Sequence, residues 1–181
     1  MTIVILHGIE GHAGIHWQQW LNDELIKAGH KVIMPNLPQS QHPDRHTWLH
    51  FIKNIIDNLS QDEEIILVGH SLGVITALDF IETSKRKISK LISVSGFAKP
   101  TDNPLNDYFM KEKTTKFKKV LKNLKSAVVI YGTKDPYVPQ KILSHLAKKL
   151  KVEPIIIKDG GHLNTESGFT RFPQILSAII D

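Results

Sequence analysis

Short apolar runs alternate with amphipathic segments along almost the whole chain. Most of the apolar runs are rich in valine and isoleucine and end at glycine, proline or serine, which is typical of strands covered on both faces of a sheet. These runs span residues 3–6, 31–34, 64–68, 90–94, 127–131 and 153–157. The segments between them carry apolar side chains at helical spacing. The predicted helices span residues 17–28, 47–59, 72–81, 114–124, 139–150 and 171–180.

This order of strands and helices predicts an α/β fold. Right-handed crossovers would place helices on both faces of a six-stranded parallel sheet. The chain has 181 residues, a length that suits one domain covering residues 1–181, and no repeat or linker divides it. The longest irregular stretch is residues 96–113. We interpret it either as a loop that leans over a functional site or as a plain surface excursion.

The most informative motif is Gly-His-Ser-Leu-Gly at residues 69–73, centred on Ser71. It follows one predicted strand and precedes an almost wholly apolar predicted helix, which is the context that the G-x-S-x-G nucleophile elbow requires. Side chains at the two glycine positions would collide in so sharp a turn. The alternative is a glycine-rich turn with an incidental serine, and the flanking strand and helix weigh against it.

A nucleophilic serine needs a base that takes its proton and a carboxylate that orients the base. His162 and Asp135 each come just after a predicted strand, so both lie at the carboxyl edge of the sheet, as Ser71 does. The chain order of serine, acid and histidine is the one that hydrolases with this elbow use. Asp102 and Asp159 are the competing acids, and we rank Asp135 ahead of both.

The loop after the first predicted strand begins with His7-Gly8. Such a loop supplies one backbone N–H of an oxyanion hole, and the residue after the nucleophile supplies the other. We predict the N–H groups of Ile9 and Leu72 for this role, with Glu10 as second choice after Ile9, and a structural role for His7. The weaker predictions for the substrate pocket are Glu10, His70, Phe97 and Tyr108.

With these residues, the chain resembles the compact serine-hydrolase family of the α/β-hydrolase fold, which includes the retinoblastoma-binding serine hydrolase and its bacterial relatives. The resemblance rests on the His7-Gly8 loop, residues 69–73, the loop at residues 132–139 and Gly160-Gly161-His162. It implies a minimal six-stranded sheet without a large lid domain, a triad of Ser71, Asp135 and His162, and no cofactor. It implies esterase or peptidase activity without fixing a substrate.

The motifs therefore predict a serine hydrolase that cleaves a carboxylic ester, thioester or amide through an acyl-enzyme on Ser71. Because no lid domain is evident, we expect an open pocket and a small acyl substrate. Two alternatives remain from the sequence. One is a non-enzymatic protein-binding module on a hydrolase scaffold, since a fold does not fix a function. The other is an acyltransferase.

Composition excludes some classes of site and partner. The chain has no cysteine, so it contains no disulfide, thiolate nucleophile or cysteine-based metal site. The spacing of His42, His46 and His50 can place ligands on one helical face, but Pro43 interrupts it, and we predict no metal. The net charge of +5 is modest, so we interpret it as favouring solubility and expect no nucleic-acid partner.

The remaining predictions concern location and surface. No segment has the length of a transmembrane helix and no signal peptide is evident, so we expect a cytoplasmic protein without stable membrane insertion, most simply a monomer. Residues 111–125 contain seven lysines and one acidic residue. We interpret them as the solvated face of a packed helix, with contact to an anionic membrane or a partner as the alternative.

Overall fold

Six strands form one parallel sheet in the computed structural model, which describes residues 1–180. The predicted sheet is therefore confirmed. The chain moves outward from the first strand and then crosses back past it, which creates the topological switch point where open α/β sheets bind ligands. In order across the sheet, the strands are β2 (Lys31–Ile33), β1 (Thr2–Leu6), β3 (Ile65–His70), β4 (Ile88–Val94), β5 (Leu124–Gly132) and β6 (Ile155–Ile157).

The central strands are the most apolar because both of their faces are covered. Every residue of β1 and β3 is buried, as their runs of valine, isoleucine and leucine predict. Burial of each such side chain contributes roughly 1.5–3 kcal/mol relative to exposure. The edge strands β2 and β6 have three residues each and are only partly covered.

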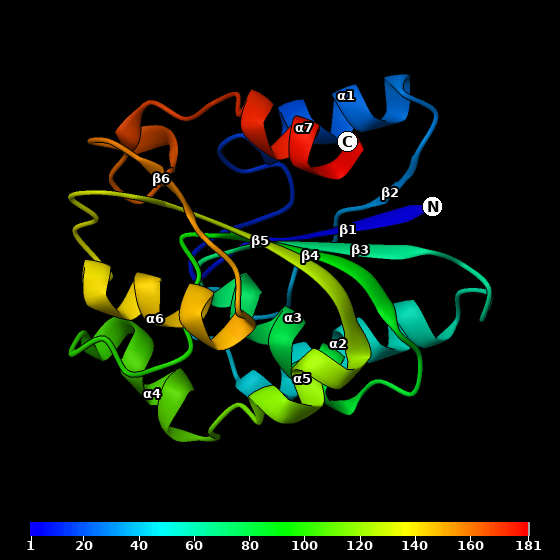
Figure 1. The fold of residues 1–181 in the computed structure, drawn as a ribbon, viewed down its shortest axis with the longest axis horizontal. Helices are drawn as coiled ribbons and strands as arrows, with labels where there is room; N and C mark the ends of the chain where they lie inside the picture. Colours follow the sequence, from blue (N-terminus) through cyan, green and yellow to red (C-terminus); the bar gives the residue numbers. More distant parts are fainter. Residues whose placement is uncertain (181) are drawn as a thin grey trace.

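Helices cover both faces of the sheet (Figure 1). One face carries α1 (Gln18–Lys27) and α7 (Pro173–Ile180), which contact each other. Trp17 and Trp48 are fully buried in the cores on the two opposite faces. The helices of the other face include α2 (Arg45–Asp57), α3 (Leu72–Thr83), α5 (Phe117–Asn123) and α6 (Gln140–Leu150).

The stretch predicted to be irregular contains a further helix, α4 (Pro104–Lys111). The side chain of Asn103 caps it by accepting a hydrogen bond from the Leu105 N–H at 3.1 Å. Proline at the first helical position has the fixed φ that a helix start requires. Phe109 packs α4 against the core. The prediction of an irregular segment over residues 96–113 was therefore wrong for α4, because Pro104 opens a helix there.

The lysine-rich residues 111–125 cover the end of α4, all of α5 and the start of β5. Val120 is buried, and all of the lysines except Lys113 are exposed, which agrees with the solvated face of a packed helix. Within residues 1–180, no helix has the length and apolar content needed to cross a bilayer.

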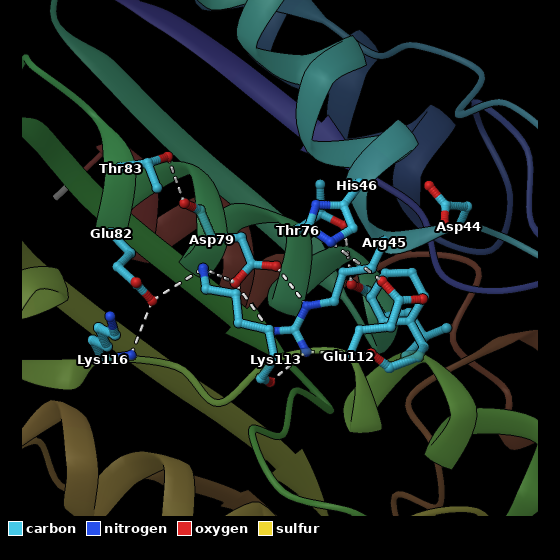
Figure 2. A network of polar contacts seen from close by, with 12 residues as sticks. Asp44, Arg45, His46, Thr76, Asp79, Glu82, Thr83, Glu112, Lys113 and Lys116 are labelled. Carbon is cyan, nitrogen blue, oxygen red and sulfur yellow. Dashed lines mark hydrogen bonds and ion pairs between the residues drawn. The ribbon is translucent and has the colours of Figure 1, made fainter.

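A buried ion pair joins α2 to α3 (Figure 2). Arg45 donates from Nε to Oδ2 of Asp79 at 2.6 Å and from Nη2 to Oδ1 at 3.0 Å. Only 2% of the Arg45 side chain and 1% of the Asp79 side chain are exposed. Two parallel hydrogen bonds are the geometry that a guanidinium favours with a carboxylate. Loss of Asp79 would leave the buried guanidinium without a carboxylate, and loss of Arg45 would remove two of the hydrogen bonds that Asp79 accepts.

The same ion pair extends to the segment that follows α4 (Figure 2). Arg45 Nη1 donates to the carbonyl oxygens of Phe109 at 3.2 Å and Lys113 at 2.8 Å. The Lys113 Nζ lies 3.0 Å from Oδ1 of Asp79 and 3.2 Å from Oε2 of Glu82. Hydrogen bonds and ion pairs of Arg45 and Lys113 therefore connect the carboxyl end of α4 to α2 and α3.

Candidate active site

Ser71 lies on a sharp turn between β3 and α3. Its φ of 54° and ψ of −123° fall in a region that residues other than glycine rarely occupy. Two backbone hydrogen bonds hold the turn. The Ser71 N–H donates to the carbonyl of Val94 at 3.0 Å, and the Ser71 carbonyl accepts from the Val74 N–H at 3.0 Å. The chain therefore has the strand, strained turn and helix of a nucleophile elbow.

The glycines on either side of the turn allow close approach of backbone segments. A Cβ at Gly69 would lie 2.7 Å from the backbone nitrogen of Val74. A Cβ at Gly73 would lie 2.5 Å from the carbonyl oxygen of Leu6. Both clashes involve backbone atoms, which cannot rotate away as a flexible side chain can. The steric reason for glycine at these two positions is therefore present in the structure.

His162 and Asp135 form a buried pair. The Nδ1 of His162 lies 2.7 Å from Oδ2 of Asp135, and 8% and 1% of the two side chains are exposed. Oδ1 of Asp135 accepts hydrogen bonds from the N–H groups of Tyr137 at 2.9 Å and Val138 at 3.0 Å. A carboxylate held in this way keeps the proton of a neutral imidazole on Nδ1, so Nε2 is free to act as a base.

The two competing acids lie elsewhere. Asp159 is exposed and forms an ion pair with Lys134, whose Nζ lies 2.8 Å from its Oδ1. Asp102 is exposed in the loop before α4. Among these three acids, only Asp135 contacts His162 in the described chain. The contact between Asp135 and His162 gives Asp135 the position that a triad acid occupies.

The backbone carbonyl of His162 is held by two side chains. His70 Nε2 donates to it at 2.9 Å, and Ser95 Oγ donates to it at 3.0 Å. Burial lowers the pKa of His70 well below its usual value, so His70 is neutral and carries its proton on Nε2. His70 is the last residue of β3 and Ser95 follows β4. His162 is therefore tied to the end of β3, the strand that immediately precedes Ser71.

The loop after β1 lies directly against the nucleophile. A Cβ at Gly8 would lie 3.0 Å from Cβ and 3.5 Å from Oγ of Ser71. Within residues 1–180, neither the Ile9 N–H nor the Leu72 N–H has a hydrogen-bond acceptor, so both are available to an oxyanion. The Glu10 N–H donates to the carbonyl of Ser40 at 2.7 Å. Of the two predicted loop donors, Ile9 is thus the one left free.

His7 fixes the shape of this loop. Its Nδ1 lies 2.8 Å from the carbonyl oxygen of Gly8, and its Nε2 accepts a hydrogen bond from the Leu37 N–H at 2.9 Å. The ring is therefore neutral with its proton on Nδ1, and burial lowers the pKa of His7 accordingly. These contacts give His7 the structural role that its position predicts.

Ser71 and His162 line one cavity of about 220 Å³ at the carboxyl edge of the sheet. Glu10 and His70, both predicted for the pocket, also line it, as does Ile9. His16 lines the cavity as well, and the other lining residues that the sequence did not single out include Ile15, Leu105, Asn106, Tyr137 and Glu166.

Two predicted pocket residues are not in the cavity lining. Phe97 is fully buried and packs in the core beneath α4. The ring of Tyr108 stacks on that of His42, with their centroids 4.3 Å apart. Both were chosen because they follow a strand end, but α4 turns other side chains toward the cavity. Leu105 and Asn106 occupy that wall, and Asn103 followed by proline was the sequence signal for the helix that carries them.

In the part of the chain that the structure describes, no three His, Cys, Asp or Glu side chains are grouped so that they could hold a metal ion. His42, His46 and His50 form no such group. The residues gathered around Ser71 are instead a hydroxyl, an imidazole, a carboxylate and free backbone N–H groups. That set suits nucleophilic attack on a carbonyl.

Comparison with known proteins agrees with this geometry. The chain is 27% identical over 155 residues to the serine hydrolase RBBP9 of Rattus norvegicus, covering 83% of this chain and 80% of that protein. It superposes on the ydeN gene product of B. subtilis with a TM-score of 0.89 and 26% identity, covering 98% and 96% of the two chains. A thermophilic esterase from Thermogutta terrifontis shares the fold, with a TM-score of 0.73 and 16% identity over 99% of this chain and 88% of that one.

The family assignment rests on almost the whole length of the protein. Residues 3–180 match the family described as Serine hydrolase. That span includes the Gly8 loop, the elbow around Ser71 and the buried pair of Asp135 and His162. The protein therefore belongs to the serine hydrolase family.

Proposed function

We propose that the protein hydrolyses small carboxylic esters through an acyl-enzyme on Ser71. The observation that carries the proposal is the 2.7 Å contact between His162 and Asp135 at the cavity that Ser71 lines. An oriented base, a nucleophile on an elbow and unoccupied N–H donors together supply the groups that acyl transfer requires.

In the acylation step, Oγ of Ser71 forms a bond to the carbonyl carbon of the ester, and the Ser71 proton passes to Nε2 of His162. The N–H groups of Ile9 and Leu72 donate to the oxygen that becomes negative. When the tetrahedral intermediate collapses, the bond to the leaving alkoxide breaks and His162 returns the proton to that oxygen. Asp135 stabilises the imidazolium and does not take the proton itself.

In the deacylation step, water attacks the acyl carbon and gives a proton to His162. The bond between that carbon and Oγ of Ser71 then breaks, and Oγ recovers its proton from His162. The products are a carboxylic acid and the free enzyme. Thioesters and amides would follow the same sequence with a different leaving group.

The size of the cavity supports a small acyl group. Its volume of about 220 Å³ is below the roughly 300–1,000 Å³ of sites that enclose drug-sized ligands. The α4 wall adds one short helix over the strand edge, and residues 1–180 hold no large lid domain that could cover a long acyl chain. We therefore expect kcat/KM to fall as the acyl chain lengthens beyond a few carbons.

Labelling with a fluorophosphonate probe tests the proposal directly. The wild type should become labelled, and Ser71→Ala should not, because the probe bonds to an activated serine. Hydrolysis of p-nitrophenyl esters from acetate to dodecanoate, with a thioester and an aminoacyl amide alongside, then defines the substrate class. A preference for dodecanoate by kcat/KM would contradict the small-substrate proposal.

The two alternative functions predict different results. A non-enzymatic binding module would leave Ser71 unlabelled and would hydrolyse esters no faster than Ser71→Ala. An acyltransferase would transfer the acyl group to an added alcohol or amine in preference to water, which product analysis by mass spectrometry detects. Either result would overturn hydrolysis as the main activity.

A further inference from the structure

Asn106 presents an unused amide to the catalytic cavity. It is the third residue of α4 and is 2% exposed. It lines the cavity that also contains Ser71 and His162. Within residues 1–180, no hydrogen bond is found for its side-chain oxygen or nitrogen, and neither atom is among the fully buried polar atoms that lack a partner, so both keep some contact with solvent. Water in the cavity can satisfy these atoms, and a ligand that displaces this water must replace its hydrogen bonds to avoid losing affinity.

The amino end of α4 is fixed by hydrogen bonds of its own. The Asn103 side chain caps the helix through the Leu105 N–H. The carboxylate of Asp107 accepts hydrogen bonds from the backbone N–H of Thr101 at 2.6 Å and from its hydroxyl at 3.2 Å. The loop before α4 is therefore bonded to the residue that follows Asn106.

The carboxyl end of α4 is fixed by the buried ion pair (Figure 2). Arg45 donates to the carbonyl oxygens of Phe109 and Lys113 while it is bonded to Asp79. Positive charge is favourable at a helix carboxyl end, where the carbonyl groups lack partners within the helix. With both ends held, Asn106 is carried on a preorganised wall, as a residue that recognises a ligand requires.

An amide side chain matches another amide well, because it offers both a donor and an acceptor. Leu105, next to Asn106 on the same wall, presents an apolar side chain to the cavity. A substrate that suited this wall would combine an aliphatic portion with a carbonyl and an N–H close to the scissile ester. An N-acylated amino-acid ester has these features.

We propose that Asn106 is a specificity-determining residue that binds an amide group in the acyl part of the substrate, and thereby selects N-acylamino-acid esters over plain alkanoyl esters. The proposal rests on the esterase function proposed above. Because a site that pairs with a polar group loses that pairing with an analogue that lacks it, discrimination depends on the amide and not only on volume.

Two p-nitrophenyl esters of matched length test it. The N-acetylglycine ester and the pentanoate ester have acyl chains of equal length, and only the first contains an amide. In Asn106→Leu, we expect kcat/KM for the N-acetylglycine ester to fall about tenfold, the loss of about one hydrogen bond. The kcat/KM for the pentanoate ester should not fall with it, since its acyl chain makes no such hydrogen bond, so the ratio of the two kcat/KM values should fall about tenfold. Equal change with both esters, or no change with either, would overturn the proposal.

Three further measurements separate this proposal from others. Fluorophosphonate labelling of Asn106→Leu should match that of the wild type, which shows an intact triad. If the wild type hydrolyses neither ester faster than Ser71→Ala does, the proposed esterase function fails, which differs from a failure of selectivity alone. Leu105→Ala should lower kcat/KM for both esters by the same factor. If Leu105→Ala shifts the ratio of the two kcat/KM values as far as Asn106→Leu does, the Asn106 amide is not the source of selectivity.

A variant that fails to fold does not end the test. If Asn106→Leu has a lower Tm or loses its circular dichroism signal, Asn106→Ser replaces it, because serine is smaller and remains polar. The short serine hydroxyl cannot pair with both the N–H and the carbonyl of a substrate amide. The ratio of the two kcat/KM values should therefore still shift in favour of the pentanoate ester. An unchanged ratio in Asn106→Ser would count against the proposal.

Discussion

Asp135 uses its two carboxylate oxygens for different partners: Oδ2 contacts Nδ1 of His162, while Oδ1 accepts from the N–H groups of Tyr137 and Val138. An asparagine here would keep its oxygen on the two N–H donors and turn its NH₂ toward His162. The imidazole would then place its proton on Nε2 and could not accept the proton of Ser71. We predict a fall in kcat of about 10³–10⁴-fold for Asp135→Asn, measured on a short p-nitrophenyl ester.

The competing acids supply the matched controls. Asp102→Asn and Asp159→Asn should each leave kcat within about twofold of the wild type, because both carboxylates are exposed and their charges are screened by water and salt. Ser71→Ala defines the background rate. If Asp102→Asn lowered kcat as far as Asp135→Asn, the triad assignment would be wrong.

The buried ion pair of Arg45 and Asp79 predicts an effect on stability. Arg45→Met keeps most of the volume but leaves Asp79 with only Lys113 as a charged partner. We expect the free energy of unfolding, measured in urea, to fall by about 3–5 kcal/mol. Arg45→Met combined with Asp79→Leu should recover part of that loss, since no buried carboxylate then lacks its partner.

An exposed ion pair provides the comparison for Arg45. The Nζ of Lys53 lies 3.8 Å from Oδ2 of Asp57 on the surface of α2. Lys53→Met should change the free energy of unfolding by about 0.5 kcal/mol or less. Similar losses in Arg45→Met and Lys53→Met would show that the buried pair does not contribute as its geometry indicates.

His70 predicts a dependence of stability on pH. Its pKa in the folded protein is lowered by burial, so below about pH 6.5 the unfolded chain binds a proton that the folded chain does not. Stability therefore falls as the pH falls from about 6.5 toward the folded pKa, by at most about 1.4 kcal/mol per pH unit from this residue.

The variant His70→Gln tests this contribution, because glutamine retains an N–H donor for the His162 carbonyl and does not titrate. Urea unfolding at pH 7 and pH 5 should show a smaller loss of stability in His70→Gln than in the wild type. His7 and His16 have pKa values shifted in the same direction and remain in both proteins. Equal losses in the two proteins would mean that His70 is protonated in the folded state.

Gly73 predicts a steric effect at the elbow. Gly73→Ala would bring a Cβ within 2.5 Å of the Leu6 carbonyl oxygen and 2.6 Å of the His7 carbonyl oxygen. We expect a loss of about 3 kcal/mol in unfolding free energy, with loss of esterase activity. Gly29→Ala is the control. Gly29 has a φ of 84° with open space around it, so only backbone strain of about 1–2 kcal/mol is expected there. A milder effect at Gly73 than at Gly29 would contradict the close packing of the elbow.

The sequence predicts the sheet well because burial on both faces leaves a local signal. The apolar runs of β1 and β3 are continuous and too short for a typical buried helix, so they indicate strands covered on both faces. α4 was missed because residues 96–113 were interpreted as one irregular stretch. Asn103 and Pro104 in fact form a cap and a first turn, a signal that depends on the order of the two residues.

The predicted triad residues come from motifs tied to strand ends; the structure brings Ser71 and His162 to one cavity and Asp135 into contact with His162. The rest of the cavity follows from tertiary packing. Nothing local shows that Asn106 lines a cavity while Tyr108, two residues further along, stacks on His42. The pairing of Arg45 with Asp79 spans 34 residues and leaves no periodic pattern in the sequence.

The hydrogen bonds from His70 and Ser95 to the His162 carbonyl have a consequence for which parts of the sequence can change. His70 and Ser95, at the ends of two strands, bond to the backbone of His162 itself. The position of His162 therefore does not depend on the length of the loop that follows it. Residues inserted near η1 (Thr165–Ser167) would change the wall of the cavity that Glu166 lines, while both hydrogen bonds to the His162 carbonyl could remain. That loop is where evolution or an engineer can change substrate range without rebuilding the catalytic machinery.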